Sequence, residues 1–223
     1  MRAVVVSGAG RYADPWHDFA GTSARLAAEL VSLGLDAEVL TLGEADVPST
    51  GVELLVVNAG GGSTPREVTS TETDRRAEAL ADWAREQTAG GLPTLVTHTG
   101  SNTFYDDDQW EQLIGGRWVP GTSWHPPLAP AQVQVTAAVH PITAGLGEQL
   151  SVVDERYCDL RVAPDVTVLV DQEEDGRRHP IVWARAAGGV RVVHDALGHD
   201  VAAYDSPDRR ALLAREVDWL LQR

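Results

Sequence analysis

The sequence predicts a single α/β domain built on a doubly wound, mostly parallel sheet. Short apolar runs alternate along the chain with segments of helical periodicity, which is typical of parallel strands covered by helices on both faces. The clearest of these runs are unbroken, as expected for buried strands. No linker, internal repeat or low-complexity segment divides the 223 residues, so one domain is expected over residues 1–223.

The first half of the chain supplies the clearest element signals. Short apolar or β-branched runs predict strands at residues 2–6, 37–41, 54–58 and 92–97. A helix over residues 23–33 carries leucines at helical spacing and stops before Gly34. A longer helix over residues 71–87 begins with Thr71 and Asp74 in a capping-box-like arrangement.

The second half is richer in predicted strands. A short helix over residues 110–114 follows three aspartates that can cap it, and a proline-rich loop is expected over residues 121–130. The closing helix opens at Ser206-Pro207-Asp208 and carries an apolar stripe. Further runs predict strands at residues 133–137, 166–170, 180–183 and 190–195. These strands are expected to add antiparallel pieces at one edge of the sheet.

Composition narrows the range of partners. The 18 basic and 33 acidic residues give a formal net charge of −15, and no basic stripe stands out, so no nucleic-acid partner is expected. The chain runs from Met1 directly into the first predicted strand, and no apolar stretch approaches membrane-spanning length, so no membrane partner is expected. The single cysteine, Cys158, cannot form an internal disulfide. These features predict a cytoplasmic protein.

Three histidines follow three different predicted strands. His17 comes after the first strand, His98 directly after the fourth and His199 after the last, with Asp18 and Asp200 beside two of them. Ligands of open parallel sheets bind beyond the carboxyl ends of the strands. We therefore expect the three histidines to line one pocket. A structural role is as common as a functional one for any single histidine, so their convergence carries this prediction.

Further candidates lie in the second half of the chain. Asp154-Glu155 follows an apolar run and precedes Tyr157. A carboxylate there could orient a histidine, bind a sugar hydroxyl or act as a base, whereas pairing with a nearby arginine is an equally good structural interpretation. His125, in the middle loop, could line the same cleft. Of the other histidines, His140 is expected in a turn, His179 at the surface and His194 in the core.

Two common kinds of site are not supported. Residues 8–13 match the G-x-G-x-x-A dinucleotide fingerprint, but Asp14-Pro15 follows at once and the next helix starts too late to face a pyrophosphate. A second glycine run, residues 60–62, follows the third strand. Cys158 lies outside any strand-to-helix turn, and no G-x-S-x-G elbow occurs, so covalent catalysis by a cysteine or serine is not expected.

Seven short segments stand in a fixed order along the chain. They are His17-Asp18, His98-Thr99-Gly100, WEQLIGG at 110–116, HPITAGL at 140–146, DERY at 154–157, PIVW at 180–183, and 188–200 ending in Gly-His-Asp. Together they resemble the trehalose-utilisation (ThuA-like) family over nearly the whole chain. There are departures from the family pattern. Val190 replaces a usual glycine, His194 replaces a usual aromatic, and the first loop has one histidine rather than a run.

The resemblance implies a flavodoxin-like, class I glutamine amidotransferase-like fold. His98 then stands at the turn where an amidotransferase would carry its cysteine, so glutamine hydrolysis through a thioester is not expected. The family also implies work on carbohydrates, in particular cleavage of disaccharides or other glycosides already oxidised at C3. A 3-keto group acidifies the C2 proton, so a base can remove it and expel the C1 substituent before water adds back.

The resemblance also implies roles for the candidate residues. The catalytic residues would be His98, His199 and Glu155. The carbohydrate would contact His17, Asp18, His125, Asp200, Tyr157 and Trp16. No organic cofactor is implied. Whether the three strand-end histidines bind a divalent metal ion is left open. Homo-oligomerisation also stays open.

Two alternatives to an enzyme are compatible with the same residues. One is a non-catalytic sugar- or metabolite-binding protein on this scaffold, because a fold does not fix a function. The other is a structural subunit or an amidotransferase-like regulator. An enzyme needs at least two proton-transfer groups converging on one pocket, whereas a subunit would show a large exposed apolar face.

Overall fold

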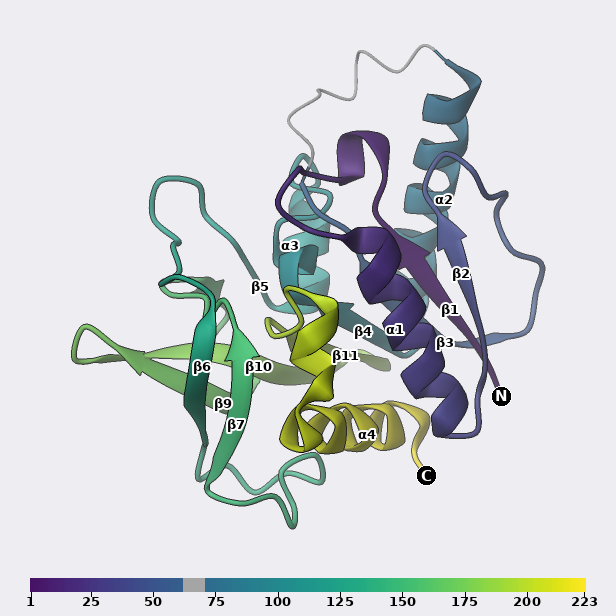
Figure 1. Cartoon of the computed structure of the whole chain (residues 1–223). Helices are drawn as coiled ribbons and strands as arrows, with labels where there is room; N and C mark the ends of the chain where they lie inside the picture. The colour runs from purple at the N-terminus through teal and green to yellow at the C-terminus, as the bar shows by residue number, and fades with distance from the viewer. Residues whose placement is uncertain (62–70) are drawn as a thin grey trace.

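The parallel half of the sheet contains five strands in the order β2-β1-β3-β4-β11, as seen in a computed structural model that describes residues 1–61 and 71–223 (Figure 1). All neighbours in this half pair in parallel. The strands are β1 (Arg2–Ser7), β2 (Asp36–Thr41), β3 (Val52–Asn58), β4 (Thr94–Thr97) and β11 (Val190–Asp195). This is the flavodoxin-like strand order, which confirms the doubly wound fold that the sequence predicts.

The antiparallel half continues from β11 through four more strands. In order they are β10 (Arg177–Ala187), β9 (Thr167–Glu174), β6 (Ala129–Val135) and β7 (Gln149–Asp154). β6 pairs with β9 over only two residues, so the β6–β7 pair is free to turn out of the plane of the sheet (Figure 1). A separate two-stranded sheet joins β5 (Gly116–Arg117) to β8 (Arg161–Val162). The predicted antiparallel edge is thus confirmed.

Helices cover both faces of the parallel half. α1 (Phe19–Ser32) and α4 (Pro207–Leu221) pack on one face against side chains such as Val5 and Val56. α2 (Glu72–Ala89) and α3 (Asp108–Ile114) pack on the other face against side chains such as Val4 and Leu55. The strand residues predicted to be buried are fully buried: Val4, Val5, Leu55, Val56, Leu95 and Val96. Burial on both faces explains why these strands are unbroken apolar runs.

Short polar caps set where the helices begin. The Asp18 carboxylate accepts the N–H of Gly21 at 2.9 Å, so α1 starts at Phe19, four residues earlier than the leucine spacing indicates. The predicted capping box of Thr71 and Asp74 is present at the start of α2. The Ser206 hydroxyl accepts the N–H of Arg209 at the start of α4, and Pro207 occupies the first turn of this helix.

Two features of the antiparallel half differ from the sequence predictions. β7 has exposed and buried side chains in near alternation, as one-sided edge strands do, where the sequence shows only a strand-like apolar run before Asp154. His179 was expected at the surface beside two arginines, but it is buried in β10, where its Nδ1 accepts the N–H of Asp159 at 3.1 Å. Arg177 and Arg178 at the start of β10 are exposed, whereas the loop that carries Asp159 packs on His179 and buries it.

Among the described residues, no helix combines the length and the apolar character that a membrane span requires.

Candidate functional site

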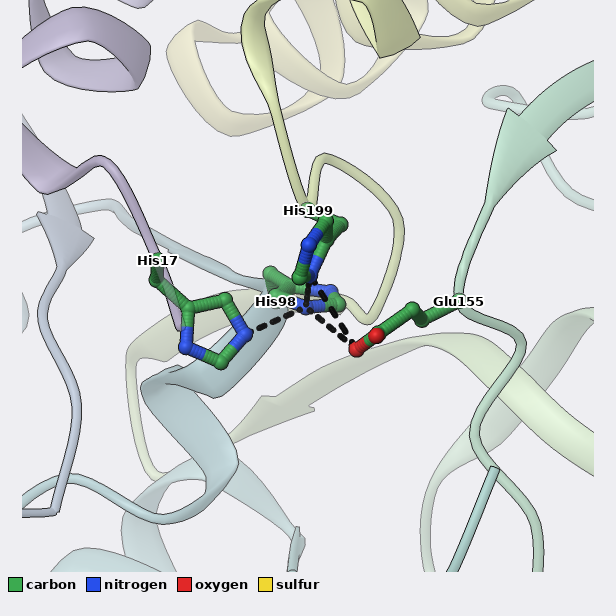
Figure 2. Close-up of side chains that lie close together, drawn as sticks. All are labelled: His17, His98, Glu155 and His199. Atoms are coloured by element: carbon green, nitrogen blue, oxygen red, sulfur yellow. Dashed lines mark hydrogen bonds and ion pairs between the residues drawn. The ribbon is translucent and has the colours of Figure 1, made fainter. Parts of the chain in front are cut away.

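Four side chains from four separate loops meet beyond the strand ends (Figure 2). His17 follows β1, His98 follows β4, His199 follows β11 and Glu155 follows β7. One nitrogen from each histidine and one oxygen from Glu155 all lie within 4.8 Å of one another. We call these four residues the histidine–glutamate cluster. The sequence predicted the meeting of the three histidines, and Glu155 joins them.

The contacts within the cluster are short and centred on His98. Its Nε2 lies 3.2 Å from Nε2 of His17 and 3.4 Å from Nδ1 of His199. The Oε2 atom of Glu155 lies 3.1 Å from Nδ1 of His199 and 4.0 Å from Nε2 of His98. The hydroxyl of Tyr157 lies 3.0 Å from the same Nε2 atom. Five polar groups therefore share one small volume.

The backbone turn after β4 sets the position of His98. His98 has φ of +43°, in the left-handed region that a non-glycine residue rarely adopts, at the start of a 3₁₀ turn over His98–Ser101. Such a conformation costs about 1–2 kcal/mol for an L-residue and is typical of functional sites. Gly100 makes the turn possible, because a Cβ there would overlap the Cγ1 methyl of Val96. The sharp strand-to-helix turn resembles a nucleophile elbow.

In His98 and His17, the ring nitrogen that points away from the cluster, Nδ1, contacts a hydrogen-bond acceptor. Nδ1 of His98 lies 2.7 Å from the carbonyl oxygen of Ala196, and Nδ1 of His17 lies 2.6 Å from Oδ1 of Asp14. A carbonyl or carboxylate oxygen only accepts, so the proton sits on Nδ1 in both rings. In their neutral forms both rings then direct the Nε2 lone pair into the cluster. Sequence reasoning missed Asp14, although its place three residues before His17 was visible.

A second missed residue, Asp154, supports the loop that carries His199. The buried carboxylate of Asp154 accepts the backbone N–H of Gly198 at 2.7 Å and that of His199 at 3.1 Å. Asp195 accepts the N–H of Leu197 at 2.9 Å within the same loop. Asp195 is paired at 2.9 Å with Arg209 of α4, and both side chains are fully buried. A charged network under the loop therefore holds His199 in place.

Burial and nearby charges shift the pKa values of His98, His199 and Glu155 in different directions. Burial, together with the charge of His17, holds the pKa of His98 well below its ordinary value, so His98 is neutral. The hydrogen bond to Glu155 raises the pKa of His199. Burial acts to raise the pKa of Glu155, but the hydrogen bond and charge of His199 outweigh it and the pKa is lowered. Both shifts favour the charged forms of the two side chains, a carboxylate on Glu155 and an imidazolium on His199.

The remaining predicted residues fall into three groups. His125 and Tyr157 lie at the cluster, with His125 Nε2 3.5 Å from Oε2 of Glu155 and its side chain 35% exposed. Burial raises the pKa of Tyr157 well above its ordinary value, so its hydroxyl stays protonated and donates to His98. Asp18 and Asp200 instead accept backbone N–H groups as caps of the helical turns that follow them. Trp16 is 76% exposed.

Other sequence candidates lie away from the cluster. His194 is fully buried in β11 and stacks on Trp183, as expected of a core histidine. His140 accepts the N–H of Ile142 at 3.2 Å and so forms the expected turn. In the glycine run, Gly60 and Gly61 approach the side chains of Phe19 and Asn102, respectively, and Gly62 lies outside the described residues.

Residues 53–220 match the family model described as ThuA, trehalose utilisation. The chain belongs to the ThuA family. The ThuA match covers His98, Glu155 and His199 of the cluster, whereas His17 precedes it. No curated protein sequence matches the chain.

Solved structures that are similar to the chain include two ThuA-like proteins. The protein from Parabacteroides merdae is 18% identical with a TM-score of 0.71, over 99% of this chain and 89% of that protein. The protein from Bacteroides uniformis is 16% identical with a TM-score of 0.72, over 98% and 90%. A glutamine amidotransferase from Thermotoga maritima is 10% identical with a TM-score of 0.61, over 100% and 98%. These likenesses confirm the class I glutamine amidotransferase-like fold.

Proposed function

We propose that this ThuA-family chain cleaves glycosides already oxidised at C3, by elimination of the C1 substituent followed by addition of water. The observation that carries the proposal is the 3.1 Å contact between Oε2 of Glu155 and Nδ1 of His199, set beside two further histidines beyond the strand ends. A non-catalytic binder would have no need for proton affinities separated in this way.

The reaction requires a base, an acid and a site for negative charge. A base removes the C2 proton, the C1–O bond breaks with its electrons passing to oxygen, and the leaving group takes up a proton. Water then adds at C1 of the resulting enone and a proton returns to C2. The sum is hydrolysis of the glycosidic bond. Negative charge develops on the C3 oxygen in both halves, so positive charge nearby would lower both barriers.

Accessibility favours His199 over His98 as the residue that exchanges protons with a sugar. His98 is 2% exposed and its Nε2 is surrounded by the other cluster members, whereas His199 and Glu155 are partly exposed. We assign proton transfer to the His199–Glu155 pair, with His98 as the buried inner member of the site. We assign sugar contacts to His125, which is more exposed than its neighbour Glu155, and to the exposed ring of Trp16. Aromatic faces commonly pack on sugar rings, and His125 can exchange hydrogen bonds with hydroxyls.

The test compares 3-keto-trehalose with unoxidised trehalose in D₂O, following release of the two sugars. Elimination and hydration return a solvent-derived atom to C2, so the 3-ketoglucose released by the protein should carry deuterium there from the first turnover. A no-protein control corrects for spontaneous exchange next to the ketone. Equal cleavage of both substrates, or products without deuterium, would contradict the elimination route. No cleavage of any 3-keto-glycoside in a panel would contradict the function.

A further inference from the structure

We propose that the histidine–glutamate cluster is a binding site for one divalent transition-metal ion of the Zn²⁺ type. The ligand atoms would be Nε2 of His17, Nε2 of His98, Nδ1 of His199 and Oε2 of Glu155. The inference rests on the geometry of these residues and holds whether or not the proposed reaction is correct.

The spacing of the ligand atoms fits a small cation. A tetrahedral ion with nitrogen and oxygen ligands at about 2.0–2.1 Å places its ligand atoms about 3.3–3.4 Å apart. Three separations in the cluster lie close to this value: 3.2 Å for His17–His98, 3.4 Å for His98–His199 and 3.1 Å for His199–Glu155. The largest separation among the four atoms is within 4.8 Å. Small side-chain rotations would close the remaining gap.

The orientation of two rings indicates a place for a positive charge. The Ala196 carbonyl and the Asp14 carboxylate fix the Nδ1 protons, so when both rings are neutral their Nε2 lone pairs face each other at 3.2 Å. Two acceptors at this distance repel unless a proton or a metal ion lies between them. Metal-binding histidines commonly donate their outer N–H to a carboxylate or a backbone carbonyl, and His17 and His98 show one of each arrangement.

The donor set selects the kind of ion. Three imidazoles and one carboxylate suit Zn²⁺ and neighbouring transition metals, whereas Mg²⁺ and Ca²⁺ prefer sites made of oxygen. The carboxylates of Glu155 and Asp14 would offset the charge of the ion. His17, Glu155 and His199 are partly exposed, which gives an ion access from solvent. An ion held by Nδ1 of His199 and Oε2 of Glu155 would take the place of the proton between these two atoms, so the bound ion and the proton-transfer pair would exclude each other.

A substitution of Tyr157 can tell whether the cluster binds a metal ion or only protons. Its hydroxyl donates to the Nε2 lone pair of His98, which the ion would use. Metal binding must therefore displace this hydrogen bond. Tyr157→Phe removes the competitor, so it should leave the affinity for Zn²⁺ unchanged or increase it. If protons alone fill the cluster, Tyr157→Phe only removes a buried hydrogen bond and produces no metal affinity.

The experiment uses the full chain without a histidine tag, stripped with chelator and returned to chelator-free buffer. Calorimetric titration with Zn²⁺ should give one equivalent per chain, and Co²⁺ should produce visible absorption bands of a nitrogen- and oxygen-ligated ion. His17→Ala and His98→Ala should each abolish the cobalt bands. Asp14→Asn should weaken Zn²⁺ binding by about 10- to 100-fold, as loss of a ligand-orienting partner does. His140→Ala, which removes a distant histidine, should change nothing.

Circular dichroism checks that each variant is folded. If His98→Ala does not fold, His17→Ala alone still tests the proposal. Failure of the stripped protein to bind one equivalent of Zn²⁺ or Co²⁺ would overturn the proposal. So would stoichiometric binding that survives both histidine substitutions. A protein that binds the ion but does not cleave 3-keto-glycosides would retain the metal site and lose the proposed function.

Discussion

The carboxylate of Asp154 accepts the backbone N–H of His199 at 3.1 Å, 45 residues away along the chain. The adjacent residue, Glu155, contacts the side chain of His199. Two neighbouring acids thus hold one histidine at two levels, Asp154 through the backbone and Glu155 through the ring. Burial raises the pKa of Asp154 to about 7, although its two backbone donors act in the opposite direction.

Asp154→Asn should destabilise the fold and loosen His199. An amide can accept only with its oxygen, so its NH₂ group faces one of the two buried N–H donors. The unmet hydrogen bond should cost about 1–3 kcal/mol in the free energy of unfolding, measured by urea denaturation. Asp165→Asn is the control, since Asp165 is half-exposed in its pair with Arg185 and should contribute less than about 1 kcal/mol. Equal effects of the two substitutions would contradict the role of Asp154.

The strained backbone at His98 predicts that a glycine variant is more stable to unfolding than an alanine variant. Alanine at φ of +43° keeps the strain, whereas glycine adopts this conformation freely. His98→Gly should therefore be about 1 kcal/mol more stable than His98→Ala, although both lose the imidazole. Thermal and urea unfolding of the two variants provide the measurement. If the alanine variant is the more stable, His98 is not held in a left-handed conformation.

Activity should depend more on His199 than on its carboxylate partner. Loss of a general acid–base group typically costs about 100- to 10,000-fold in rate, so His199→Ala should lose at least 100-fold in kcat on a 3-keto-glycoside. Glu155→Gln keeps a hydrogen-bond acceptor for the ring and should lose less. Steady-state kinetics with folded variants measures both. A His199→Ala variant with full activity would remove His199 from the mechanism.

A buried acid in α4 predicts how stability varies with pH. Burial, reinforced by the nearby charge of Asp195, raises the pKa of Glu216 well above its ordinary value, so the folded chain keeps this proton. The unfolded chain releases it near the ordinary value of about 4.3. The stabilising contribution is therefore complete below that pH and declines as the pH rises towards the folded pKa.

Glu216→Gln, which mimics the protonated acid, should remove this pH dependence. Its stability should match that of the wild type in acid and exceed it increasingly above about pH 5. Urea denaturation at several pH values measures the difference. Parallel stability curves for the two proteins would show that Glu216 is ionised in the folded state.

The strand ends and the histidines could be predicted because they depend on local patterns. Unbroken apolar runs mark the parallel strands, and the carboxyl ends of such strands meet at one edge. Hence His17, His98 and His199 could be grouped from sequence alone. The Ala196 carbonyl, which orients His98, could not be predicted because every residue carries the same backbone group.

The buried charges were harder to foresee for a different reason. Arg209 and Glu216 lie on the core-facing side of α4, in phase with Leu212 and Leu220, yet charged residues usually mark the solvent face of a helix. Their spacing was a visible signal, but their partner Asp195 lies on another element. Only the tertiary structure shows that the three ionisable side chains meet.

Glu155 reaches the cluster from β7, the outermost strand of the antiparallel half, whereas the histidines belong to the parallel half. The outer edge of β7 is held by the start of α4, where Ser206 and Asp208 bond the backbone of Ser151. If this edge opens locally, Glu155 leaves the cluster and His199 loses its backbone support from Asp154, while His17 and His98 stay together. A ligand that contacts both halves of the sheet must dissociate before this edge can open, so its binding free energy would add to the free energy of opening. Slower amide hydrogen exchange across β6 and β7 would report such a ligand, even where the helices are unaffected.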